Sequence, residues 1–339
     1  MLGQAPGLGH VFHFMFPVLL ALALIFDFLN GFHDSANIVA TVIASRAMHP
    51  RAALILAALA EVAGPFLFGV AVATTVGDEL FAAAALTESV VIAALVSAVV
   101  WNLVTWYLGI PSSSSHALLG GMLGAGVLAA GLGVVKLQGL LKILLALLLS
   151  PMLGLAVGFL IMRLTLWLVR RSAPGVNQVF RRLQVLTLLG LGLSHGTNDA
   201  QKTMGVIALG LVTAGLQESF FVPTWVIAVS ALAIALGTSL GGWRLIRTLG
   251  ARMYRVRPIH GFTSQIAGAS VILGAALLGG PVSTTQVMSS SIVGVGAGER
   301  ASKVRWNILG EMIVAWLLTI PVTAGLAALA YLGLNLILR

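Results

Sequence analysis

The segment His195-Gly-Thr-Asn-Asp-Ala-Gln-Lys202 repeats, in altered form, the earlier segment Asn30-Gly-Phe-His-Asp-Ser-Ala-Asn37. Glycine and aspartate are in register, and the two aspartates lie about 165 residues apart. A second repeated pair lies farther along each half, where Gly109-Ile-Pro-Ser-Ser-Ser-Ser-His116 matches Gly280-Pro-Val-Ser-Thr-Thr-Gln286. Each copy places polar residues and expected helix breaks within an apolar stretch. Duplicated broken membrane helices are the best sequence indication of the substrate site of a secondary transporter.

The composition predicts an all-α integral membrane protein. Hydrophobic residues make up 59% of the chain and charged residues only 9%, whereas a soluble domain has about 25% charged residues. Apolar runs of about 20 residues are long enough to cross the hydrocarbon core of a bilayer. We therefore expect a multi-pass protein of the cytoplasmic (inner) membrane. Candidate spans are 52–76, 88–109, 143–168, 222–243, 261–279 and 308–338.

Several classes of function are disfavoured by the sequence. The net charge of +9 does not indicate nucleic-acid binding, because the basic residues lie in short loops where positive-inside topology explains them. The chain has no cysteine, which excludes thiol catalysis and cysteine metal sites. It also lacks a GxxxxGK[ST] motif and any Ser-His-Asp spacing. We expect no enzyme and no cofactor, only a transported cation.

Loop charges predict that the chain consists of two inverted repeats of about five crossings each. The loop with Arg46 and Arg51 corresponds to a later loop with Glu218, and the acidic loop at Asp78 corresponds to the basic loop 244–257. Opposite charge in equivalent loops is expected when two halves enter the membrane from opposite sides. This threading puts both termini outside. The predicted units are repeat 1 at 1–169, a basic cytoplasmic linker at 170–182, and repeat 2 at 183–339.

Two aspartates within membrane segments are candidate cation ligands. A single aspartate at the centre of a membrane helix costs about 2.5–3.5 kcal/mol, so Asp34 and Asp199 each need a partner or a ligand. Asn37 shares a helix face with Asp34, and Asn198 adjoins Asp199. Carboxylate and amide oxygens beside a helix break suit a hard cation. The alternative is that these side chains only hydrogen-bond helices together.

Lys202 occupies in the second copy the position of Asn37 in the first. It places a positive charge where the first copy has a neutral amide, which works against a second alkali-cation site. Lys202 is predicted to pair with Asp199, to attract an anion, or to exchange a proton during transport; a plain buried ion pair is compatible with each.

Two hydroxyl-rich runs are candidate anion ligands. Hydroxyls and free backbone N–H groups at the start of a helix form a cradle for a tetrahedral oxyanion. Proline before each run suits a helix start, and the glycines that follow permit close helix approach. The alternative for such a run is packing or hydrogen bonding within its own helix. The residues are Ser112, Ser113, Ser114 and Ser115 in the first copy and Ser283, Thr284, Thr285 and Gln286 in the second, with His116 matching Gln286.

Four other polar residues are less decisive. His33 and His195 border the two expected breaks and either relay protons or serve as hydrogen-bonded structural histidines. Glu61 and Glu311 lie in apolar stretches, so each is expected to need a partner.

These motifs together resemble the inorganic phosphate transporter (Pit) family, and in particular its bacterial low-affinity branch. The resemblance runs through nearly the whole chain and rests on both copies, residues 30–46 and 194–208. It implies symport of phosphate with a cation through an inverted-repeat fold with re-entrant Ser/Thr-rich hairpins. By the motif, Asp34, Asn37, Asn198 and Asp199 would lie on the cation side.

The chain also departs from the family pattern. In the sodium-coupled branch both copies resemble the pattern Asn-Asp-x-x-Asn. This sequence has His33 at the first position of the pattern in the first copy and Lys202 at its last position in the second copy. The departure favours proton over sodium coupling and fits a branch thought to carry metal–phosphate complexes. If the cation is sodium, Asp34, Asn37 and Asp199 are the expected ligands. The family's large soluble insert between the halves is absent.

The predicted function is therefore phosphate symport across the cytoplasmic membrane, with protons or sodium as the coupling cation. The expected partners are phosphate, the cation and the lipid bilayer, and a homo-oligomer is left open. A sulfate permease of the same family and an uncoupled anion channel are the alternatives, because tetrahedral geometry alone does not separate phosphate from sulfate.

Overall fold

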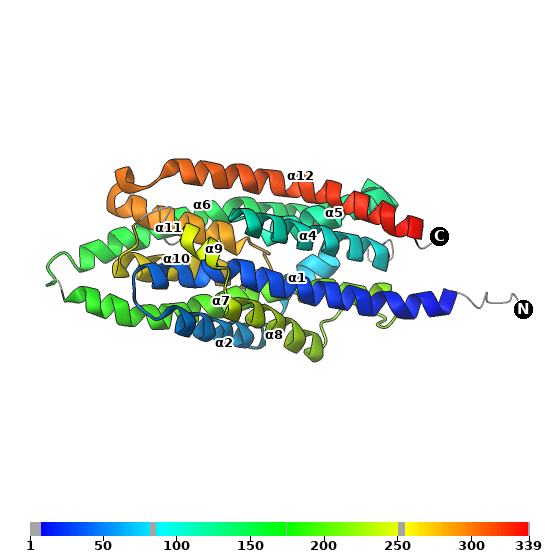
Figure 1. Ribbon diagram of the computed structural model, residues 1–339, viewed down its shortest axis with the longest axis horizontal. Coiled ribbons are helices and arrows are strands. Elements are labelled where there is room, and N and C mark those ends of the chain that lie inside the picture. Colours follow the sequence, from blue (N-terminus) through cyan, green and yellow to red (C-terminus); the bar gives the residue numbers. More distant parts are fainter. Residues whose placement is uncertain (1–7, 82–85, 174, 250–254, 338–339) are drawn as a thin grey trace, which may run out of the picture.

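The computed structural model describes residues 8–81, 86–173, 175–249 and 255–337, and these residues form helices without any named strand. Most of the helices lie along the long axis of the molecule (Figure 1). Within these ranges, five helices are long and apolar enough to cross a membrane: Met15–Ala44, Pro50–Phe68, Glu88–Leu108, Leu137–Leu168 and Trp306–Ile337. The prediction of an all-α membrane protein is confirmed at this level.

The first half of the chain forms five principal helices. They are α1 (Leu8–Ala44), α2 (Pro50–Phe68), α4 (Glu88–Leu108), α5 (Ser114–Ala130) and α6 (Leu137–Leu168), with the short α3 (Ala71–Thr74) and a π-helical turn (Thr75–Glu79) after α2.

The second half repeats this order of long and short helices. Its elements are α7 (Val176–Thr213), α8 (Thr224–Leu240), the short α9 (Trp243–Arg247), α10 (Pro258–Leu277), α11 (Thr284–Arg300) and α12 (Trp306–Ile337). Because α7 begins at Val176, its first two turns occupy the second part of the predicted linker 170–182.

The predicted breaks at the two aspartates are wrong. Helix α1 runs without interruption through residues 30–37, and α7 does so through residues 195–202. A glycine in a helix costs only about 1 kcal/mol relative to alanine. The polar side chains of these segments bond to neighbouring elements, so the backbone has no need to open. Helix α6 is likewise continuous, with Pro151 inside it.

The chain does break at the two Ser/Thr-rich runs. Helix α4 ends at Gly109, which has a left-handed φ of 70°, and α5 begins only after Ser113 caps its first turn. In the second half, Gly279 has a φ of 69° after α10, and Ser283 caps α11. Each capping hydroxyl accepts a hydrogen bond from the backbone N–H three residues on, at 3.2 Å and 3.3 Å. The two helix pairs α4–α5 and α10–α11 therefore turn at buried serines and threonines.

Helices of one half pack on helices of the other in a reciprocal pattern. Helix α1 packs on α8 and α7 on α2, while α5 packs on α12 and α11 on α6. In Figure 1, α5 lies toward the end with the C-terminus and α11 toward the opposite end. The pairs α4–α5 and α10–α11 thus approach the interior from opposite ends of the bundle.

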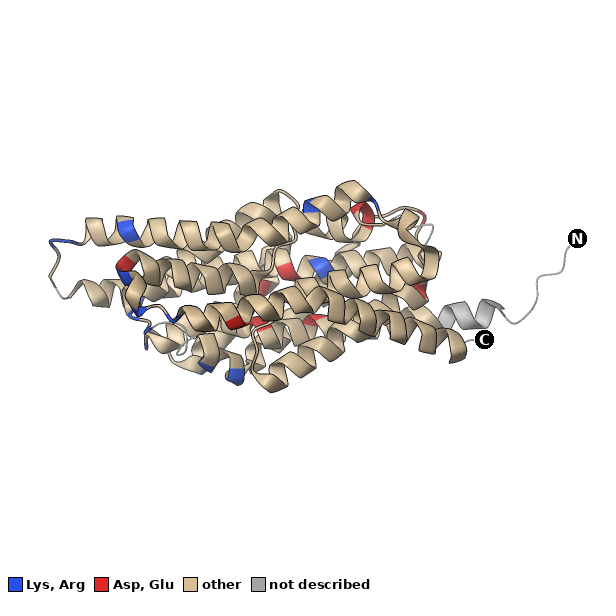
Figure 2. Cartoon of the chain, turned by 90° about the horizontal axis from the view of Figure 1, so that it is seen from above, with Lys and Arg blue, Asp and Glu red and all other residues tan. Residues whose placement is uncertain are grey.

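The charged residues are distributed unevenly along the long axis. Figure 2 shows most of the lysines and arginines at the end away from the C-terminus. The acidic loop at the other end is neutralised locally, because Lys142 Nζ lies 2.9 Å from Glu79 Oε2. An uneven distribution of this kind is what the positive-inside rule describes for multi-pass membrane proteins.

Close approach of α5 to α12 requires a glycine. A side-chain carbon on Gly124 would collide with the backbone of Ala324, whereas Gly325 on the facing helix has open space around it. A side-chain carbon on Gly294 of α11 would likewise collide with the backbone of Leu155 in α6.

We expect Gly124→Val to destabilise the fold by about 1–3 kcal/mol, because it overpacks a helix contact. Gly325→Val, on the exposed side of α12, is the matched control and should have little effect. Thermal unfolding in detergent measures both variants. Equal melting temperatures for the two would contradict the close packing of α5 on α12.

Candidate functional site

The side chains of Asp34 and Asp199 meet at the N-terminus of α11. Thr284 Oγ1 lies 3.1 Å from Asp34 Oδ2 and 2.7 Å from Asp199 Oδ2. Thr285 donates a second hydrogen bond of 3.0 Å to Asp34 Oδ1. Both carboxylates are essentially inaccessible to solvent, with exposed fractions of 1% and 0%. One threonine hydroxyl therefore bridges the two repeated aspartates of α1 and α7.

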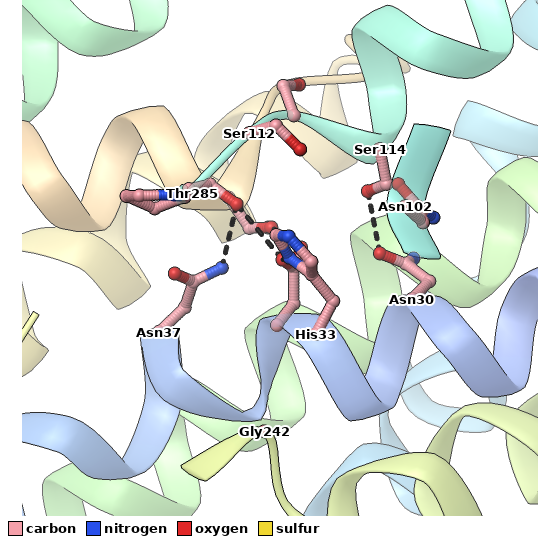
Figure 3. A network of polar contacts seen from close by, with 12 residues as sticks. Asn30, His33, Asn37, Asn102, Ser112, Ser114, Gly242 and Thr285 are labelled. Carbon is pink, nitrogen blue, oxygen red and sulfur yellow. Dashed lines mark hydrogen bonds and ion pairs between the residues drawn. The ribbon is translucent and has the colours of Figure 1, made fainter. Parts of the chain in front are cut away.

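The amides next to the aspartates also contact α11 and the segment that precedes it. Asn37 Nδ2 donates a hydrogen bond of 3.1 Å to Thr285 Oγ1, and the two side chains point toward each other in Figure 3. Asn198 Nδ2 donates one of 3.2 Å to the Gly280 carbonyl. Among the described residues, Asn198 Oδ1 has no hydrogen-bond partner. The structure brings all four predicted cation-side oxygen ligands into one buried region.

Lys202 points into the same region and has three oxygen partners. Its ammonium group forms a short ion pair with Asp199. It also donates hydrogen bonds of 2.6 Å to Ser115 Oγ and 2.8 Å to the Val282 carbonyl. Lys202 is 1% exposed. The predicted pairing of Lys202 with Asp199 is confirmed.

The serines before and within α5 are held by several different elements. Ser112 donates to Thr105 Oγ1 at 2.8 Å, and Ser114 donates to Asn30 Oδ1 at 2.6 Å (Figure 3). Ser115 donates to the Val282 carbonyl at 3.1 Å. This last bond joins the turn of the α4–α5 pair to the turn of the α10–α11 pair, so the two hydroxyl runs lie next to each other.

A histidine between two carboxylates completes the site. His195 Nδ1 lies 2.6 Å from Glu61 Oε1, and His195 Nε2 lies 2.8 Å from Asp199 Oδ2 and 3.9 Å from Asp34 Oδ2. Glu61 belongs to α2, so this contact joins the two halves of the chain. On the first aspartate, His33 Nδ1 lies 2.9 Å from Asp34 Oδ1.

The sequence predictions for this region were incomplete. The predicted site did not include Asn30, Glu61 or His195, although Asn30 and His195 contact its members and Glu61 contacts His195. An isolated glutamate in an apolar stretch was a signal for Glu61, and it has the predicted partner. Glu311 lies on the exposed side of α12 and is not part of this region.

The arrangement offers ligands for both signs of charge. The nearest ligand atoms of Asp34, His195 and Asp199 all lie within 4.8 Å of one another, which suits a cation. Within the described residues, Gln286 Oε1 is buried without a hydrogen-bond partner. The first turns of α5 and α11 supply N–H groups and the positive end of the helix dipole, which favour an anion. A cation and an oxyanion can therefore be bound side by side.

Comparison with known proteins is consistent with this chemistry. The chain matches the phosphate transporter family over residues 30–327. It is 43% identical over 324 residues to the probable low-affinity inorganic phosphate transporter of Bacillus subtilis (strain 168), covering 94% of this chain and 97% of that protein. It is 44% identical over 321 residues to the protein of the same description from Rhizobium meliloti (strain 1021), covering 94% and 96%.

A solved structure has the same fold over nearly the whole chain. It is described as the sodium-dependent phosphate transporter, and it matches with a TM-score of 0.86 at 25% identity, covering 95% of this chain and 99% of that one. Sequence and fold agree: the chain belongs to the phosphate transporter family.

Proposed function

We propose that the protein is a symporter that moves inorganic phosphate, alone or as a metal–phosphate complex, across the cytoplasmic membrane with a proton or sodium ion. The observation that carries the proposal is the bridge from Thr284 to both Asp34 and Asp199. It places the start of a helix, which attracts anions, in direct contact with two carboxylates, which attract cations.

On the anion side, the phosphate ligands are the two hydroxyl-rich runs. The two runs lie next to each other, because Ser115 of the first donates a hydrogen bond to the main-chain carbonyl of Val282, which directly precedes the second. Rotation of these hydroxyls away from their present partners would expose donors to a tetrahedral oxyanion. The proposed ligands are Ser112, Ser113, Ser114, Ser115, Ser283, Thr284, Thr285 and Gln286.

On the cation side, the proposed ligands are Asp34, Asn37, Asn198 and Asp199, with Lys202 as a charged neighbour. The solved relative is named sodium-dependent. Since Lys202 already contacts Asp199, the first copy around Asp34 and Asn37 is the better place for a mobile cation. The charges of a cation and an anion bound side by side offset each other, which lowers the cost of moving either of them between the two sides of the membrane.

The proposed architecture is a pair of inverted repeats, 1–169 and 183–339, joined by the cytoplasmic segment 170–182. The reciprocal packing of α1 on α8 and α7 on α2 supports it. In this scheme α4–α5 and α10–α11 are re-entrant hairpins that enter from opposite sides. Relative motion of the halves around the shared site would give alternating access.

Reconstituted protein should concentrate labelled phosphate when a proton or sodium gradient is imposed, and should not concentrate sulfate. Counterflow in proteoliposomes, with the two gradients clamped separately, identifies the coupling ion. A titration of external pH separates the anions, because phosphate changes charge near neutrality and sulfate does not. Flux that neither gradient can drive uphill would indicate an anion channel and contradict symport.

Asp34→Asn should abolish phosphate accumulation while the protein remains folded, because the amide keeps the shape of the side chain but removes its charge. Asp78→Asn is the control, since Asp78 is 47% exposed and lies 3.9 Å from Lys136. Uptake driven by the coupling gradient measures both. Wild-type accumulation by Asp34→Asn would remove this carboxylate from the mechanism.

Thr284→Val should lower the rate of phosphate uptake by at least tenfold, because loss of one hydrogen bond to a charged group costs about 1.5–3 kcal/mol. Thr319→Val is the matched control, since Thr319 is buried and its hydroxyl bonds only to Ala315 of its own helix. Initial uptake rates are compared at equal amounts of folded protein. Equal rates for both variants would show that the bridging hydroxyl has no role in transport.

A further inference from the structure

The ammonium group of Lys202 is surrounded by the kinds of oxygen that bind a metal cation. Its three partners are a carboxylate of Asp199, the hydroxyl of Ser115 and the main-chain carbonyl of Val282. Carboxylates, hydroxyls and carbonyls are the ligands of hard cations. An ammonium group has three N–H donors, so each of them has one of these oxygens as its acceptor.

The three partners come from three separate elements. Asp199 lies on α7, Ser115 on α5, and Val282 in the segment that leads into α11. A bound cation at this point would bridge the same three elements. Lys202 reaches it from α7, one helical turn after Asp199, and its side chain is almost fully buried. A long lysine side chain is therefore ordered completely, at a considerable cost in conformational entropy.

The first copy of the repeat contains the matching oxygens without the ammonium. In register, Asp34 matches Asp199, Thr285 matches Ser115, and Asn37 matches Lys202. Asn37 and Asp34 both bond to the Thr285 hydroxyl, at 3.1 Å and 3.0 Å. Both copies therefore place a carboxylate and a hydroxyl around one point, next to a neutral amide in the first and a positive charge in the second.

We propose that Lys202 is a tethered cation that permanently fills the second of two equivalent cation positions. The inference rests on the proposed symport function and specifies its stoichiometry: one mobile cation binds in the first copy for each phosphate, and none binds in the second. Lys202 neutralises Asp199 in every step of the cycle and holds the two helix turns together. If Lys202 were only one member of a structural ion pair, its removal would not create a binding site for a free cation.

Removing the tethered charge should create a site for a free cation. In Lys202→Asn the second copy acquires the amide of the first, and in Lys202→Ala it acquires space beside Asp199, Ser115 and the Val282 carbonyl. Lys142→Asn is the matched control, because the Lys142 ammonium also contacts a carboxylate and a hydroxyl, on Glu79 and Thr75, but is 38% exposed. Sodium chloride and ammonium chloride are the probes, with choline chloride at equal ionic strength as the reference.

Melting temperature in detergent is the first measurement, because it does not depend on transport. A cation at ten times its dissociation constant should raise the melting temperature of either Lys202 variant by about 3 °C relative to choline. This rise should exceed that of the wild type and of Lys142→Asn. It should vanish in the double variant Lys202→Asn/Asp199→Asn. Equal responses in all five proteins would overturn the proposal.

Phosphate exchange at equilibrium in proteoliposomes is the second measurement. Exchange by Lys202→Ala should require sodium or ammonium beyond the coupling cation that the wild type needs and recover at least tenfold when either is added, whereas exchange by the Lys142 control should respond to these cations as the wild type does. Exchange by Lys202→Ala that is equally fast in choline would also overturn the proposal. Wild-type protein that exchanges no phosphate would instead contradict the proposed function.

The wild type supplies a third test that needs no substitution. The number of coupling cations per phosphate follows from the cation gradient at which net phosphate flux stops. The proposal requires one cation that binds at the site, and a ratio of two would overturn it even if both Lys202 variants failed to fold.

Discussion

The structure depends on the burial of two carboxylates, Asp34 and Asp199, deep inside an apolar bundle. Each would cost about 2.5–3.5 kcal/mol alone at the centre of a membrane helix, and their mutual repulsion would add to that cost. Thr284 contacts both, and its position requires α11 to begin at the middle of the bundle instead of at its end. The turn before α11 and the close packing of its glycines on α6 hold Thr284 at this position.

The sequence repeat predicted many of the residues that lie together in this region, but not Asn30, and not how the backbone carries them. Polar residues and glycines in an apolar stretch suggested two broken helices, yet α1 and α7 are continuous. The reason is that their polar side chains find partners on other elements, so the main chain keeps its own hydrogen bonds. The breaks lie only where a proline and a capping serine coincide, before α5 and α11. Proline with a serine cap was thus the more reliable signal.

Contacts between elements distant in sequence were beyond what local patterns reveal. The position of Glu61 in α2 gives no indication that it faces His195 of α7, because that contact depends on how the two halves pack. The Val282 carbonyl that accepts from Lys202 is a backbone atom, and its role has no sequence signature. In contrast, the pairing of Lys202 with Asp199 was predictable, since residues three apart share one face of a helix.

The two copies of the motif differ in charge at one position, which is a neutral amide in the first copy and a positive ammonium group in the second. The packing around this position accommodates both. Asn37 in the first copy and Lys202 in the second both donate to a hydroxyl at the start of the facing short helix, Thr285 or Ser115. A hydroxyl can accept a hydrogen bond from an amide or from an ammonium group. The backbone framework is therefore compatible with either donor, and the bond shortens from 3.1 Å with Asn37 to 2.6 Å with Lys202. Charge in one half of a duplicated site can thus change without disturbing the fold that both halves share.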